Sequence, residues 1–84
     1  MAWKEVKNTK NDGEYLEREL VCKDFISTWA FMNKVALLAE KLGHHPDWSN
    51  SYNKLNIRLS SHDAGNKITE KDRNFAELID KLGH

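Results

Sequence analysis

Several features that would define a protein class at once are missing from this sequence. Among its 84 residues there is one cysteine, Cys22, and one proline, Pro46. A single cysteine cannot close a disulfide within the chain, so packing must hold the fold and a cytoplasmic location is expected. No apolar run approaches the roughly 18 residues that a membrane-spanning helix needs. The charged N-terminal residues also argue against a secretory signal.

An excess of one charge sign is missing as well. The sequence holds 13 Lys and Arg against 13 Asp and Glu, which gives a formal net charge of zero. This balance argues against direct binding to nucleic acid or to an anionic membrane. The length predicts one domain over residues 1–84. Because so short a chain buries only about 60% of its unfolded surface, self-association would add useful burial.

Hydrophobic periodicity predicts an α+β fold in the order ββαββα. The expected elements are strands at Trp3–Val6 and Tyr15–Val21, a helix over 25–42, a hairpin of two strands that turns near Asn53-Lys54, and a last helix that begins at Thr69. Asp24 is the expected N-cap of the first helix, and Gly43 is its expected end.

The first helix carries two apolar ladders at helical spacing. One consists of Phe25, Trp29, Met32, Ala36 and Ala39, and the other of Thr28, Phe31, Val35, Leu38 and Leu42. Together they form a band wider than one sheet face usually requires. We therefore expect this helix to cover a sheet, with Trp29 in the core, and also to meet a second surface such as another subunit.

Three of the four histidines, His44, His45 and His62, fall in predicted junctions or strand ends. Histidine is the side chain best suited to exchange protons near neutral pH. Pro46 biases His45 towards an extended backbone and so fixes how the pair is presented. A solvated pair on a polar loop is the ordinary alternative.

Metal binding is another alternative for these histidines, with Glu40, Asp47, Asp63 or Asp72 as further ligands. Adjacent histidines fit this function poorly, because they do not chelate one ion as an i/i+4 helical pair does. No native metal site is therefore expected.

Aromatic and acidic residues flank the histidines. Trp48 has the flat ring needed to stack on a heterocycle, and Tyr52 would either cap a pocket or cover the sheet. Asp72 stands three residues after Thr69, where a capping box and a pocket role are compatible. Glu40 precedes His44 by one helical turn, although a solvated glutamate at a helix end is equally ordinary.

The run from Glu40 to Trp48, Glu-Lys-Leu-Gly-His-His-Pro-Asp-Trp, is followed at signature spacing by Tyr52, His62 and Asp72. This pattern resembles the signature of the pterin-4a-carbinolamine dehydratases. The resemblance implies helices on one face of a four-stranded antiparallel sheet, assembled as homodimers or homotetramers. It implies loss of water from 4a-hydroxytetrahydropterin to give quinonoid dihydropterin, in tetrahydrobiopterin recycling. The pterin is the substrate, and no cofactor is implied.

The resemblance also implies a role for each matching residue. The catalytic residues would be His44, His45 and His62, the supporting carboxylates Glu40 and Asp72, and the substrate-binding residues Pro46, Trp48 and Tyr52. As a hypothesis, His45 and His62 lie nearest the departing hydroxyl and His44 is the base. The loop over residues 63–68 departs from the family's usual Gly-Gly-Leu form, which bears on the placement of Asp72.

A second class of function stays open beside catalysis. Some animal relatives bind a transcription factor and stabilise its dimer, so a non-catalytic pterin-binding, dimerisation or coactivator module is the alternative. The sequence itself gives no support for a transcription-factor partner. Retention of all three histidines favours catalysis, because a scaffold would not require them.

Overall fold

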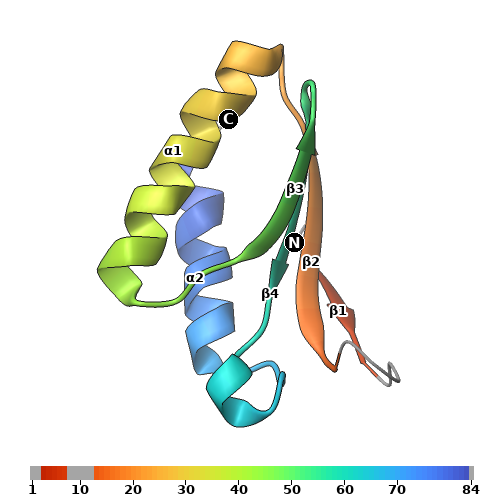
Figure 1. Cartoon of the computed structure of the whole chain (residues 1–84), viewed down its shortest axis with the longest axis vertical. Coiled ribbons are helices and arrows are strands. Elements are labelled where there is room, and N and C mark those ends of the chain that lie inside the picture. The colour runs from red at the N-terminus through yellow and green to blue at the C-terminus, as the bar shows by residue number, and fades with distance from the viewer. Residues whose placement is uncertain (1–2, 8–12, 84) are drawn as a thin grey trace.

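The structure is a computed structural model that describes residues 3–7 and 13–83. Its elements are β1 (Lys4–Val6), β2 (Tyr15–Val21), α1 (Phe25–Leu42), β3 (Asp47–Ser51), β4 (Lys54–Leu59), the 3₁₀ turn η1 (His62–Ala64) and α2 (Glu70–Leu82). Both helices lie on one side of a four-stranded antiparallel sheet (Figure 1). The predicted α+β class and the order ββαββα are therefore confirmed.

The sheet has the strand order β1-β2-β4-β3, so β1 and β3 are its two edges. Side chains alternate along β4, where Leu55, Ile57 and Leu59 are fully buried and the intervening side chains are not. This alternation places one face of the sheet against the helices. Phe75 and Ile79 of α2 are fully buried in the same core cluster.

The first helix begins and ends where the sequence predicts. The Asp24 carboxylate accepts a hydrogen bond from the Ser27 backbone N–H at 2.8 Å. Gly43 ends α1 in the left-handed conformation (φ 64°), which glycine adopts without steric penalty. The His44 N–H then bonds back to the Ala39 carbonyl at 3.1 Å. This cap turns the chain sharply and sends His44 out of the helix end.

The assignment of Trp29 to the core is wrong, because its side chain is 45% exposed. The sheet and α2 cover the stripe of α1 that contains Thr28, Phe31 and Val35. Trp29 lies at the border of this stripe and packs edge-to-face on Phe25, with ring centroids 6.1 Å apart. The width of the apolar band therefore exceeds what one chain covers.

The hairpin also turns earlier than predicted. Tyr52 lies in the turn rather than in a strand, and its φ of 53° is unusual for a bulky residue. The Asn50 side-chain amide donates to the carbonyls of Tyr52 and Lys54 at 3.0 and 2.9 Å, which holds the turn closed.

At the other edge of the sheet, Trp3 precedes β1 instead of starting it. Its buried indole N–H donates to Asp80 at 2.8 Å. Within residues 3–7 and 13–83, no helix has both the length and the apolar character to cross a bilayer.

Candidate active site

Three chain segments meet at the end of the molecule where α1 stops. They are the turn after α1, the end of β4 with η1, and the first turn of α2, which lie together in the lower part of Figure 1. The turn supplies His44 and His45, the segment after β4 supplies Ser61 and, at the start of η1, His62, and α2 supplies Asp72. The fold therefore gathers the signature histidines at one end.

The centre of this site is the carboxylate of Asp72, which is fully buried. One of its oxygens, Oδ2, accepts hydrogen bonds from the Thr69 backbone N–H and the Ser61 hydroxyl, both at 2.9 Å. The first of these bonds belongs to the predicted capping box, which is confirmed. A buried carboxylate needs such partners to offset its loss of hydration. The other oxygen, Oδ1, is directed at His44.

His44 is held against Asp72 from two sides. Its Nε2 lies 2.5 Å from Asp72 Oδ1, and its ring packs on Phe75 with centroids 6.0 Å apart. Only 12% of the His44 side chain is exposed. Packing and the carboxylate together fix the ring orientation, so His44 is preorganised within the single chain.

His45 and His62 are arranged differently, since both side chains are about two-thirds exposed. His45 Nε2 lies 2.6 Å from the Glu40 carboxylate. His62 Nδ1 lies 2.7 Å from the Asn66 side-chain oxygen, and its Nε2 is 3.8 Å from Asp47. Each ring has a polar neighbour but no packing that locks it. These two histidines border the buried His44–Asp72 pair on the solvent side.

The structure separates the three residues assigned to substrate binding. Pro46 and half-buried Trp48 lie at the histidine end of β3, where Trp48 also packs against the core. Tyr52 lies beyond the other end of the same strand and is 64% exposed. At the roughly 3.3 Å rise per strand residue, Tyr52 is well out of reach of His45 within one chain.

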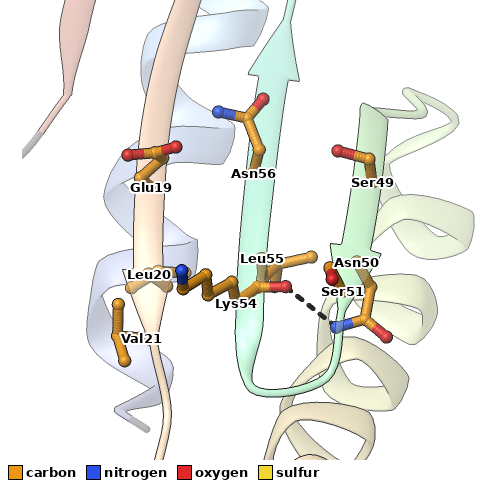
Figure 2. Close-up of a pocket in the computed structure, with 9 residues that line it drawn as sticks. All are labelled: Glu19, Leu20, Val21, Ser49, Asn50, Ser51, Lys54, Leu55 and Asn56. Atoms are coloured by element: carbon orange, nitrogen blue, oxygen red, sulfur yellow. Dashed lines mark hydrogen bonds between the residues drawn. The ribbon is translucent and has the colours of Figure 1, made fainter.

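A hollow of about 530 Å³ lies at the hairpin end of the sheet, where β2, β4 and β3 run side by side (Figure 2). Among the described residues, its lining consists of Glu19, Leu20, Val21, Ser49, Asn50, Ser51, Lys54, Leu55 and Asn56. It is therefore distinct from the histidine cluster.

Within the described part of the chain, no three His, Cys, Asp or Glu side chains converge closely enough to hold a metal ion. The candidate ligands Glu40, Asp47, Asp63 and Asp72 are instead distributed over separate partners. Glu40 contacts His45, Asp47 lies 3.8 Å from His62, Asp63 contacts Lys71, and Asp72 contacts His44.

Sequence reasoning missed Ser61, which is 1% exposed and binds Asp72. A signal for it exists in the alternation of β4. Leu55, Ile57 and Leu59 face the helices, and Ser61 continues this series by two residues. A hydroxyl in an inward phase requires a buried hydrogen-bond partner, and the carboxylate of Asp72 is that partner.

The class of protein follows from this arrangement. A small α+β chain presents a buried histidine–carboxylate pair and two exposed histidines at one end, and histidine is a side chain that can exchange protons near neutral pH. The chain belongs to the pterin 4 alpha carbinolamine dehydratase family, whose pattern it matches over residues 1–82.

Curated relatives agree with this membership. A protein of Prochlorococcus marinus strain NATL2A is 51% identical over 71 residues, which cover 84% of this chain and 74% of that protein. A second, from strain MIT 9515, is 47% identical over 81% of this chain and 70% of its own length. Both carry the name pterin-4-alpha-carbinolamine dehydratase as a provisional assignment.

Two solved structures share the fold. A transcriptional coactivator/pterin dehydratase from Brucella melitensis has a TM-score of 0.83 and 34% identity, covering 99% of this chain and 83% of that one. A pterin dehydratase-like protein described as a RuBisCO assembly factor in the alpha-carboxysome has a TM-score of 0.77 and 26% identity. That match covers 98% of this chain and 89% of the other.

Proposed function

We propose that this chain is a lyase that dehydrates 4a-hydroxytetrahydropterin to quinonoid dihydropterin. In this reaction the C4a–O bond breaks and the hydroxide leaves as water, with a proton supplied by an acid. A base removes a proton from the pterin ring nitrogen next to that carbon. The reaction therefore needs two proton-transfer groups of moderate pKa, for which histidine is suited.

The observation that carries this proposal is the buried pair formed by His44 and Asp72. Asp72 Oδ2 already accepts hydrogen bonds from Ser61 and Thr69, so the group is built as an acceptor. Facing Asp72 Oδ1, neutral His44 then carries its proton on Nε2 and keeps the Nδ1 lone pair. This tautomer suits His44 to act as the base.

The exposed histidines are assigned to the departing hydroxyl. His45 and His62 stand at the solvent side of the site, each beside a polar oxygen of Glu40 or Asn66. Protonated at either ring, this pair would donate to the hydroxide as the C4a–O bond breaks. Because these rings exchange with solvent, the donor is re-protonated after each turnover.

The test is dehydration of chemically generated 4a-hydroxytetrahydropterin, followed by ultraviolet absorbance. The intact protein is compared with His44→Ala, His45→Ala and His62→Ala, with His84→Ala as the matched control outside the signature. We expect turnover to fall by about 10²–10⁴-fold in the first three and to stay unchanged in the control. Circular dichroism checks the fold. No acceleration by the intact protein would contradict the proposal.

A protein-binding function is the second candidate. The exposed apolar side chains of α1 favour it, with Phe25 at 42%, Trp29 at 45% and both Ile26 and Leu37 at 74% exposure. Two proteins of the same fold carry coactivator or assembly-factor descriptions. This candidate would be favoured over the lyase by two results together. Replacing all three histidines would leave the dehydration rate unchanged, and the chain would bind a protein partner tightly without pterin.

A further inference from the structure

His62 lies on the surface at the start of η1, so its hydrogen bonds, rather than packing, decide where its ring points. About two-thirds of its side chain is exposed. Its Nδ1 lies 2.7 Å from the side-chain oxygen of Asn66, four residues further along the chain. An amide oxygen only accepts hydrogen bonds, so Nδ1 carries the hydrogen atom in this contact. In the neutral ring, Nε2 is then the nitrogen that is left to exchange a proton.

Asn66 is itself fixed by its backbone. Its φ of 59° lies in the left-handed region, which asparagine occupies more readily than most residues. Its N–H donates to the Ser61 carbonyl at 3.0 Å, and its carbonyl accepts from the Glu14 N–H at 2.8 Å. Ser61 belongs to the buried part of the site, whereas Glu14 directly precedes β2. Asn66 is therefore held between the site and the sheet, and its side chain reaches His62 from there.

The segment before β2 approaches the loop closely at this point. A Cβ atom on Gly13 would lie 2.5 Å from the Asn66 carbonyl oxygen, well inside van der Waals contact. Gly13 also has a φ of 72°, which glycine adopts without steric penalty. The Glu14 carbonyl accepts from the Ser60 hydroxyl at 2.7 Å. These contacts join the start of β2 to the loop on both sides of His62 in the chain, and so fix the position from which Asn66 contacts the ring.

We propose that Asn66 is a positioning residue, which orients His62 so that Nε2 faces the substrate. The role of His62 as proton donor rests on the proposed lyase function, whereas the orientation of its ring by Asn66 does not. In the reaction, the C4a–O bond breaks with its electrons on oxygen, and protonated His62 gives its Nε2 proton to the departing hydroxide, which leaves as water. The neutral ring keeps its Nδ1 hydrogen bond to Asn66, and Nε2 takes a proton from solvent before the next turnover.

An amide suits this task because it orients the ring without adding a charge. The other two histidines of the cluster face carboxylates instead, those of Asp72 and Glu40. A carboxylate favours the protonated ring and so opposes release of its proton. The neutral partner of His62 therefore leaves the ring free to donate.

Charged groups also surround His62, and they stay the same when Asn66 is changed. Asp47 of β3 lies 3.8 Å from Nε2, which is beyond hydrogen-bond distance. Asp63 follows His62 in η1 and contacts Lys71 of α2 at 3.3 Å. Among residues 3–7 and 13–83, Asn66 is the hydrogen-bond partner of the His62 ring, so its removal should release the ring.

The orientation is tested by nuclear magnetic resonance, independently of activity. Long-range ¹H–¹⁵N spectra at alkaline pH, where the rings are neutral, report which nitrogen of each histidine carries hydrogen. The His62 signals are those missing from His62→Ala. We expect hydrogen on Nδ1 in the intact protein and loss of this preference in Asn66→Gly, which suits the left-handed backbone and should fold normally. An unchanged tautomer in Asn66→Gly would overturn the orientation.

The role in turnover is tested with the pterin assay. We expect Asn66→Gly to lose at least about 10-fold in turnover. Ala64→Gly is the control, because it adds the same backbone freedom in the same loop, and it should lose none. Asn66→Asp keeps an acceptor beside Nδ1, so turnover should return to within a few-fold of the intact protein. Its activity should persist to higher pH, because the carboxylate favours the protonated ring.

A double variant decides whether Asn66 acts through His62. If it does, Asn66→Gly should cause no further loss of turnover in the His62→Ala background, which has no ring to orient. Losses that multiply, or full turnover of Asn66→Gly in an active protein, would overturn the positioning role. An intact protein that shows the Nδ1 tautomer but no dehydration would contradict the lyase and support the orientation.

Discussion

Each helix of this protein has an aspartate in its capping interaction, at a different position and in different surroundings: Asp24 is the N-cap of α1, whereas Asp72 is the N3 residue of α2, whose N-cap is Thr69. Asp24 starts α1 with one hydrogen bond from the Ser27 N–H, near the protein surface. Asp72, at N3 of α2, is fully buried, and it binds Ser61 and His44 in addition to the Thr69 N–H. The capping of α1 thus needs only one partly exposed carboxylate, which accepts a hydrogen bond from a backbone N–H of the first turn. The additional partners of Asp72 exceed what a helix cap needs, and this excess is what supports the proposed role of Asp72 in the site.

The largest loss of stability and turnover is expected when the capping contact of Asp72 and its contact with His44 are removed together. Asp72→Ala deprives the Thr69 N–H and the Ser61 hydroxyl of their acceptor and releases His44. We expect the free energy of unfolding to fall by about 3 kcal/mol, with turnover lost. Urea denaturation measures the first change and pterin dehydration the second. A loss of stability no larger than that of Asp24→Ala would show that the buried cap is ordinary.

Asp72→Asn separates the two roles. The amide oxygen can still accept from Thr69 and Ser61, whereas its NH₂ group presents hydrogen atoms to His44 instead of a carboxylate. We expect a stability loss of only about 1 kcal/mol with a turnover loss of about 10²-fold. Equal turnover in Asp72→Asn and the intact protein would remove the carboxylate from the proposed mechanism.

Asp24→Ala tests the simple cap. The hydrogen bonds from Ser27 hold the pKa of Asp24 below its ordinary value of 3.8. A lowered folded-state pKa stabilises the protein above the ordinary value, and this stabilisation disappears as pH falls through the folded-state pKa. We expect a melting temperature about 5 °C lower at neutral pH, and a gap that narrows in acid. Turnover per folded molecule should not change, and a reduced turnover would contradict a purely structural cap.

The smallest structural effect is expected for Glu40→Gln. Glu40 and His45 form an exposed pair, with 77% and 63% of their side chains accessible, and such pairs contribute little to stability. The melting temperature should therefore stay the same, while turnover falls several-fold as His45 loses an anionic neighbour. If Glu40→Gln and the intact protein have the same turnover across the pH range, Glu40 is a solvated residue with no part in the reaction.

Much of the fold could be predicted because it depends on local patterns. The strand Tyr15–Val21, the helix Phe25–Leu42 and its caps Asp24 and Gly43 agree with the periodicity and with end signals. Trp29 could not be placed, because a ladder defines an apolar stripe but not how far the sheet and α2 extend over it. That limit depends on tertiary docking.

The features of the candidate site likewise fall into those that local sequence patterns predict and those that depend on tertiary contacts. The sequence predicts the capping box from the spacing of Thr69 and Asp72, and it predicts the turn that presents His44 from Gly43. Contact between them requires the ends of two helices to meet, which spacing along the chain does not give. Tyr52 was misread as a strand residue because the alternation from Trp48 continues through it. The Asn50 amide ends the strand earlier, and that is a side-chain contact invisible to periodicity.

The two roles of Asp72, in the capping box and in the proposed site, would have an evolutionary consequence. A descendant that abandoned catalysis could change His45 and His62 freely, because neither ring supports the fold. The same lineage would still need a hydrogen-bond acceptor at position 72, because the Thr69 N–H and the Ser61 hydroxyl would otherwise lack a partner in the interior. Drift in such a lineage would therefore remove the exposed histidines first and leave a buried hydrogen-bond acceptor at position 72.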